Sequence, residues 1–223
     1  MAINTEQYLQ LTALASQQHA TLVAVSKTKP VADIQALYQL GQRDFGENYV
    51  QELTEKQTQL PTDIRWHFIG HLQTNKVKYI APFVHLVHGV DSLKLLQEIN
   101  KQAQKNNRVI PCLLQVYIAK EETKFGLDEE ELQNIMEALE PLAHIKITGF
   151  MGMASFSSDV NVVRKEFNSL KVLFDTYKQI TKPNFQLQHL SMGMSGDYQL
   201  ALEEGSTMVR IGSLLFGARN YQQ

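Results

Sequence analysis

Hydrophobic positions along this chain alternate between short continuous runs and longer segments with helical spacing. Short apolar runs bounded by polar or glycine-containing turns are typical of strands buried on both faces. Such runs predict strands over 22–26, 43–46, 64–70, 83–90, 109–118, 144–153, 185–191 and 208–212. Apolar residues that recur every three or four positions predict helices over 31–40, 48–57, 73–79, 92–103, 128–139, 159–180 and 195–203.

A further helix is expected before Thr21, where Tyr8, Leu11, Leu14 and Ala15 share one face. Strands that alternate with helices in this way predict an α/β protein, a (β/α)8 TIM barrel with an extra N-terminal helix. An open doubly wound sheet is the alternative fold. Because no segment rich in Pro, Gly or Ser divides the chain, residues 1–223 are expected to form a single domain.

Composition narrows the classes of ligand and the cellular location. The chain carries 21 Lys+Arg against 23 Asp+Glu, a formal charge of −2 without a long basic run, and this disfavours nucleic acid and anionic membranes. Cys112 is the single cysteine, so no intrachain disulfide forms, as is usual for proteins of reducing compartments. Neither a leader peptide nor a bilayer-spanning apolar segment of about 20 residues is evident. We therefore expect a cytoplasmic protein that binds a small molecule.

Candidate chemistry collects after the predicted strands, where (β/α)8 barrels place their active groups. Lys27 follows the first strand in SKTKP; a lysine there is usually a solvated surface residue, but burial would make it a nucleophile. SMGMSGD (191–197) and RIGS (210–213) offer hydroxyl groups and glycines suited to a phosphate, although glycines also serve plain turns. A lysine and a phosphate site at one barrel mouth suggest pyridoxal 5′-phosphate (PLP) held as an imine.

Other candidate sites are weaker. The pairs His67 with His71 and His85 with His88 lack a metal-binding pattern such as HExxH, and we expect no metal. The acidic run over 120–131 is typical of a solvated loop followed by a helix N-terminus. GSLLFGAR resembles a nucleotide-binding loop but lacks its lysine, so we reject that interpretation. Tyr49, near the predicted barrel mouth, is a candidate catalytic base, although an aromatic residue there more often serves packing.

Several motifs closely resemble the pyridoxal phosphate homeostasis protein family. They are AVSKTKP (24–30), FGENYVQE (45–52), WHFIG (66–70), LQTNK (72–76), SMGMSGD (191–197) and STMVRIGSLLFGAR (206–219). The resemblance runs from the first predicted strand to the last. It implies a single-domain barrel of PLP fold type III, like the N-terminal domain of alanine racemase. It also implies PLP binding without established catalysis, and a role in the cellular balance of vitamin B6 and amino acids.

Carried over by motif, the resemblance makes Lys27 the Schiff-base residue and Lys29 a second, non-bonding lysine; their spacing alone leaves either open. Arg210 would face the pyridine nitrogen. The resemblance further assigns phosphate binding to Ser191, Gly212 and Ser213, with backbone help near Met192, and contact with the ring to Asn48 and Met151. His71 interrupts an otherwise matching IGxLQ stretch and receives no role.

Arg210 argues against strong carbanion chemistry, because a guanidinium disfavours a proton on the ring nitrogen that it faces. Related racemases recruit a tyrosine base from a second domain, which we expect to be missing because the sequence ends at Gln223. We therefore expect a non-enzymatic PLP carrier, a monomer that contacts PLP enzymes transiently. The alternatives are a PLP-dependent racemase or lyase using Lys27, and a phosphate-ester isomerase or aldolase in which Lys27 forms an imine with a sugar.

Overall fold

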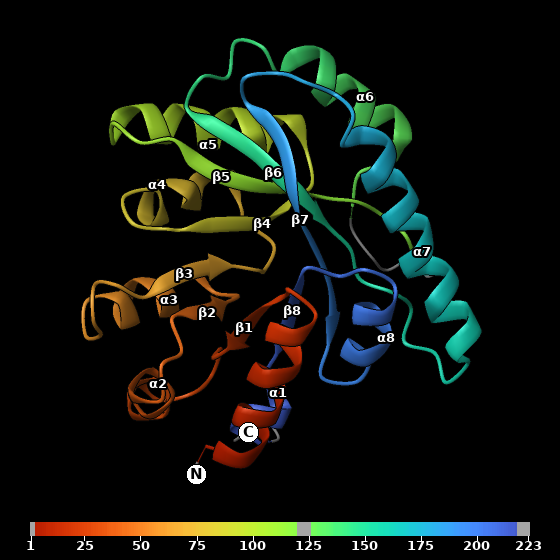
Figure 1. Cartoon of the computed structure of the whole chain (residues 1–223). Coiled ribbons are helices and arrows are strands. Elements are labelled where there is room, and N and C mark those ends of the chain that lie inside the picture. The colour runs from red at the N-terminus through yellow and green to blue at the C-terminus, as the bar shows by residue number, and fades with distance from the viewer. Residues whose placement is uncertain (1–2, 120–125, 218–223) are drawn as a thin grey trace.

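The computed structural model describes residues 3–119 and 126–217, and its eight strands close into a parallel barrel (Figure 1). The strands follow one another around the barrel in chain order, and β1 pairs with β8 to close it. This arrangement confirms the predicted (β/α)8 barrel and shows that the open-sheet alternative is wrong. The strands are β1 Thr21–Val25, β2 Asp44–Glu47, β3 Arg65–Phe68, β4 Leu86–Val90, β5 Ile110–Gln115, β6 Ile145–Met151, β7 Phe185–Met194 and β8 Met208–Ile211.

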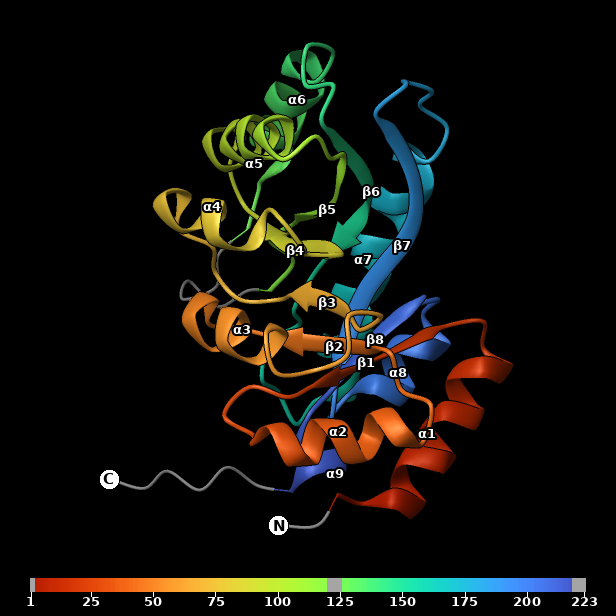
Figure 2. The ribbon, with the colours of Figure 1, turned by 90° about the vertical axis from the view of Figure 1, so that its left-hand side faces the viewer.

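Helices cover the outside of the barrel, and Figure 2 shows α2, α3, α4 and α5 stacked in chain order along one side. The N-terminal helix α1 contacts α9 and β1, and the Asn4 N–H donates to the Leu215 carbonyl at 2.8 Å. Since α9 is only four residues long, α1 completes the outer layer beside it. The helices are α1 Thr5–Gln17, α2 Val31–Gln39, α3 Val50–Gln57, η1 Thr74–Lys76, α4 Val77–Ile80, α5 Leu93–Lys105, α6 Glu129–Ala138, α7 Val160–Tyr177, α8 Tyr198–Glu203 and α9 Ser213–Phe216.

Apolar side chains form two layers, one on each face of the barrel wall. On β1, Leu22 and Ala24 join the large cluster beneath the helices, whereas Val23 joins a separate small cluster. Successive side chains of a strand point to opposite faces, so these two sets mark the outside and the inside of the barrel. The small inner cluster consists of Val23, Leu86, Leu113, Met151 and Met208. Burial on both faces explains why β1 reads as a continuous apolar run.

Element boundaries differ from the sequence predictions mainly near the barrel mouth. Strand β7 continues to Met194 rather than ending at residue 191, and its pairing with β8 shifts register between Ser191 and Met194. Helix α3 begins at Val50 because Tyr49 is still extended. The predicted start of α6 is confirmed, since Asp128 caps it and accepts from the Glu131 N–H at 2.8 Å. The acidic segment 120–125 lies outside the described residues. Among the residues that the structure describes, no helix has the length and apolar character to cross a membrane.

Candidate functional site

A cavity of about 460 Å³ opens at the carboxyl ends of the strands. Its volume lies within the range of ordinary cofactor sites. Side chains at or just after the ends of six strands line it, so it lies where barrels of this class hold their ligands. The described lining residues are Val25, Lys27, Lys29, Asn48, Ile69, Met153, Phe156, Met194, Ser195, Gly196, Arg210, Gly212, Ser213 and Gly217.

The two lysines of SKTKP have different surroundings although both line this cavity. The Lys29 ammonium donates to the carbonyl oxygens of Phe216 at 2.8 Å and Gly217 at 3.2 Å, which follow the last strand. These bonds tie Lys29 to the C-terminal end of α9. Lys27 is half-buried and lies in the turn that follows the end of β1 at Val25. Two carbonyl oxygens thus hold Lys29, and Lys27, which the resemblance assigns as the Schiff-base residue, also lies at the cavity.

A buried ionic cluster holds the turn that carries Lys27; we call Ser26, Glu47, Glu52 and Lys56 the Lys56 cluster. The Lys56 ammonium donates to the Ser26 carbonyl at 2.7 Å, to Glu47 at 2.8 Å and to Glu52 at 2.6 Å. The Ser26 hydroxyl donates to Glu47 at 2.6 Å. Glu52 also accepts from the Thr28 N–H at 2.6 Å, where the backbone has φ +62°. A β-branched residue rarely adopts this conformation, so the cluster holds the turn against local strain.

The Glu47 carboxyl group lies deep in this cluster, at 0% exposure. Burial raises the pKa of Glu47 above its ordinary value, and the neighbouring Lys56 ammonium and the Ser26 hydroxyl offset only part of that rise. The second oxygen, Oε2, is buried and has no hydrogen-bond partner among the described residues. Lys56 is therefore the main compensation for a charge that the barrel wall would otherwise exclude.

Arg210 reaches the cavity from β8 and is almost completely buried. Its guanidinium donates to the Ser191 carbonyl at 2.8 Å and hydroxyl at 2.6 Å, and to the Gly152 carbonyl at 3.2 Å. Burial lowers the pKa of Arg210 to about 10, so the group stays cationic near neutral pH. The sequence-assigned residue Arg210 thus lies at the cavity with a fixed orientation.

The loops that follow β7 and β8 meet at the cavity and contribute to its lining. The Gly212 N–H donates to the Ser195 hydroxyl at 3.2 Å, and Ser195, Gly196 and Ser213 also line the cavity. Gly193 has φ +89°, and a Cβ there would lie 2.5 Å from the Ala201 Cβ, so only glycine fits. These loops bring together two hydroxyl groups and two glycines at the cavity.

Three of the sequence-assigned residues lie deeper than the cavity lining. Ser191, Met192 and Met151 are fully buried, and the described lining residues do not include them. Met151 belongs to the inner apolar cluster, and Ser191 is bonded to Arg210. Sequence analysis did not single out Ser195 as a separate site residue, although it lies within the SMGMSGD motif.

Asn48 belongs to the lining and brings a buried amide oxygen that has no partner among the described residues. A buried acceptor without a partner is costly, so this atom fits a ligand that donates a hydrogen bond or a water held with it. Tyr49, the candidate base, is 58% exposed and lies outside the described lining.

The histidines separate into buried and surface groups. His67 and His88 are bonded to each other inside the barrel at 2.9 Å, whereas His71 is exposed and bonds Asp91 at 3.1 Å. Within residues 3–119 and 126–217, no three His, Cys, Asp or Glu side chains are arranged to hold a metal ion.

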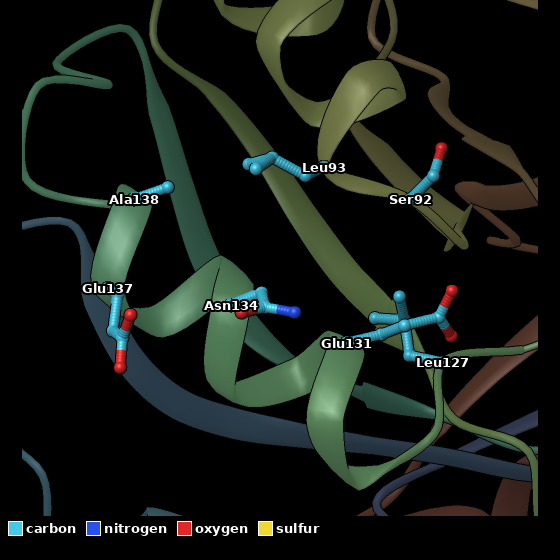
Figure 3. Close-up of a pocket in the computed structure, with 7 residues that line it drawn as sticks. All are labelled: Ser92, Leu93, Leu127, Glu131, Asn134, Glu137 and Ala138. Carbon is cyan, nitrogen blue, oxygen red and sulfur yellow. The ribbon is translucent and has the colours of Figure 1, made fainter.

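A second hollow, of about 600 Å³, lies outside the barrel between α6 and the start of α5 (Figure 3). Its polar groups include the carboxylates of Glu131 and Glu137, which repel a phosphate. None of the sequence-assigned site residues lines it. The barrel mouth therefore remains the candidate site although the outer hollow is larger.

Comparison with known proteins agrees with this fold and site. The alanine racemase N-terminal domain family matches residues 4–220. The fold and the barrel-mouth site thus define a barrel of the alanine racemase N-terminal domain class. The chain is also 44% identical over 203 residues to the pyridoxal phosphate homeostasis protein of Aquifex aeolicus (strain VF5), covering 91% of this chain and 88% of that protein. This chain belongs to the pyridoxal phosphate homeostasis protein family.

Solved structures add two reference points. PipY of Synechococcus elongatus PCC7942, with PLP bound, is 36% identical and has a TM-score of 0.84, covering 95% of this chain and 100% of PipY. Alanine racemase of Bartonella henselae has a TM-score of 0.70 at 19% identity and supports the fold alone. It covers 97% of this chain but only 60% of the racemase chain.

Proposed function

We propose that this protein binds PLP at the barrel mouth and holds it as a Schiff base on Lys27, acting in PLP and amino-acid homeostasis. The observation that carries the proposal is the convergence of Lys27, Arg210 and the Ser195–Gly212 contact on one cavity. A PLP-bound relative at 36% identity supports it. PLP supplies a reactive aldehyde and an electron-withdrawing ring.

The residues of the cavity fit the parts of this cofactor. The loops after β7 and β8 provide Ser195, Gly196, Gly212 and Ser213 for the phosphate, a position that is common in (β/α)8 barrels. Arg210 would donate to the pyridine nitrogen. The unpartnered oxygen of Asn48 suits a polar group at the ring edge.

Ser191, Met192 and Met151 would act from below the site. Ser191 would orient Arg210 through their hydrogen bond, and Met151 would form part of the apolar floor. Met192 is buried in the outer core beneath the helices, so its share would be limited to its backbone. These assignments complete the set that the resemblance implies.

We further propose a binding role rather than catalysis. An arginine facing the ring nitrogen keeps it unprotonated and weakens the ring as an electron sink. The named relatives are homeostasis proteins. A cytoplasmic monomer that forms one PLP-binding domain over residues 1–223, and that exchanges PLP through transient contacts with PLP enzymes, is consistent with the composition. A PLP-dependent racemase is the second candidate, supported by the fold that this chain shares with alanine racemases.

Reconstitution with PLP, borohydride reduction and peptide mapping test the attachment. We expect the label on Lys27, and loss of the visible Schiff-base absorbance in Lys27→Ala. Lys29→Ala should still label Lys27, and Lys101→Ala, a remote exposed substitution, serves as the matched control. A label on Lys29, or undiminished absorbance in Lys27→Ala, would contradict the assignment.

The racemase alternative is tested by incubating the PLP-loaded protein with L- and D-amino acids in deuterated water. A carrier incorporates deuterium at the α-carbon at most once per site. Multiple turnovers would favour the racemase and refute the binding role.

A further inference from the structure

A chain of hydrogen bonds runs through the barrel interior from Arg210 at the mouth to Asp44 on β2. Arg210 donates to the Ser191 hydroxyl at 2.6 Å, and this hydroxyl lies 3.1 Å from His88 Nδ1. His88 Nε2 lies 2.9 Å from His67 Nδ1, and His67 Nε2 lies 3.0 Å from Asp44 Oδ1. These five residues, from β8, β7, β4, β3 and β2, are called the barrel relay below.

The two ends of the barrel relay restrict the direction in which its protons point. A guanidinium only donates and an ionised carboxylate only accepts. Because the Ser191 hydroxyl already accepts from Arg210, its own proton is available to His88 Nδ1, the one acceptor that the described residues offer it. His88 then donates from Nε2 to His67 Nδ1, and His67 donates from Nε2 to Asp44. Both rings are therefore neutral and carry their proton on Nε2.

The reverse direction requires an imidazolium at His67 that donates to both His88 and Asp44. The Ser191 hydroxyl proton would then lack an acceptor within the described part of the chain. Arg65 already neutralises Asp44 through two hydrogen bonds, Nε to Oδ1 at 2.7 Å and Nη2 to Oδ2 at 2.5 Å. A further cation at His67 would leave the interior with excess positive charge.

The charged and titratable groups around His88 oppose its protonation. Burial lowers the pKa of His88 well below its ordinary value, and the nearby Arg210 cation lowers it further. Burial also lowers the pKa of His85 to about 4 and lowers the pKa of His189 below its ordinary value. The interior thus favours neutral rings throughout the physiological range.

We propose that Asp44, His67, His88 and Ser191 are positioning residues that fix the guanidinium of Arg210 as a permanent donor toward the cavity. The barrel relay links the amino-terminal end of the barrel, where Asp44 and Arg65 are 12% and 48% exposed, to the mouth. Its role toward the ring nitrogen rests on the proposed function. Its hydrogen-bond direction does not, because it is a property of the protein without cofactor.

Nitrogen-15 NMR of the protein without PLP tests the direction of the barrel relay. We expect His67 and His88 each to show a protonated Nε2 and an unprotonated Nδ1 at neutral pH. The resonances are assigned with His67→Gln and His88→Gln, and the exposed His71 gives a separate reference signal. A proton on Nδ1 of either buried ring would overturn the proposal.

The coupling to the mouth is tested with Asp44→Asn in PLP-loaded protein. Removing the carboxylate leaves the charge of Arg65 uncompensated and takes away the acceptor at the end of the barrel relay. The added positive potential disfavours a protonated Schiff base. We expect the pH midpoint of its visible absorbance to fall by about one unit. Asp63→Asn removes a comparable carboxylate, which accepts from Arg43 on the outside, and should leave the midpoint unchanged.

Equal midpoints in Asp44→Asn and Asp63→Asn would overturn the coupling. Circular dichroism of both variants confirms that the barrel is intact, and Ser191→Thr, which keeps a hydroxyl, should preserve the wild-type midpoint if it folds. If wild-type protein fails to bind PLP, the proposed function fails, while the NMR result still decides the direction of the barrel relay.

Discussion

Replacing Lys56 with methionine is expected to destabilise the protein severely. The substitution keeps most of the apolar stem but removes the ammonium that donates to Ser26, Glu47 and Glu52 at 2.6–2.8 Å. The Lys56 side chain is 7% exposed and Glu47 is fully buried, so Glu47 loses its main compensating charge. Breaking a buried ion pair in this way costs about 3–5 kcal/mol, a large part of the stability of a typical domain.

Urea unfolding at neutral pH, followed by circular dichroism, measures this loss. Lys101→Met is the matched control, because its ammonium is 62% exposed and lies 3.8 Å from Glu98. We expect that control to change the free energy of unfolding by less than about 0.5 kcal/mol. The double variant Glu47→Gln with Lys56→Met should recover much of the loss, since the fully buried carboxylate is then neutral and the remaining Glu52 side chain is 22% exposed. A loss below about 1 kcal/mol in Lys56→Met, or no recovery in the double variant, would refute the reasoning.

Three other measurements test separate features of the barrel. Gly193→Ala should cost about 1–3 kcal/mol in urea unfolding because φ is +89° and the new Cβ meets the Ala201 Cβ at 2.5 Å, whereas Gly196→Ala meets no atom within 4 Å and should be nearly neutral. Burial tends to raise the pKa of Asp44, but the hydrogen bonds from Arg65 and His67 outweigh it and hold the pKa below 3.8. Its stabilisation is therefore present above about pH 4 and lost as the pH falls, so the difference in melting temperature between Asp44→Asn and wild type should shrink from pH 7 to pH 3. Burial raises the pKa of the Cys112 thiol, and Ellman's reagent should react at least about 100-fold more slowly in the native protein than in denaturant; comparable rates would contradict the burial.

The barrel was predictable because its strands are buried on both faces and its helices on one. The runs around Val23 and Leu113 are apolar at consecutive positions, as burial between the interior and the helices requires. The apolar stripe from Val163 to Phe174 is the face that α7 buries against the barrel. Such patterns are local, and a single sequence displays them.

The position of Ser191 was not accessible to the same reasoning. The glycine and serine content of SMGMSGD indicates a loop, yet the backbone pairs with β8 as far as Met194 across a register shift. Whether a residue at a strand end faces the cavity or the interior depends on that register, which the partner strand decides. The contact between His67 and His88 was not predicted for a similar reason, since the two side chains meet only when β3 and β4 lie side by side.

Lys27 and Lys29 show most clearly what the sequence alone cannot distinguish, because two lysines of equal parity in one motif look alike in sequence. The carbonyls that hold Lys29 belong to residues 187 and 188 positions further along the chain. Only closure of the barrel brings α9 beside the first loop. The distinction between the two amines is therefore a tertiary property.

The polar interior of this barrel has a physical cost that bears on its function. A Ser and two His side chains replace apolar residues in a core that could be packed with aliphatic groups, and buried polar networks are seldom more stable than such packing. What the network gains is a guanidinium held by three hydrogen bonds in one orientation toward the cavity. Under the proposed function, a fixed donor at the ring nitrogen would hold PLP in an unreactive state and would be of little use for stabilising a carbanion. The barrel interior and the proposed binding role at its mouth would then follow from the same arrangement of charge.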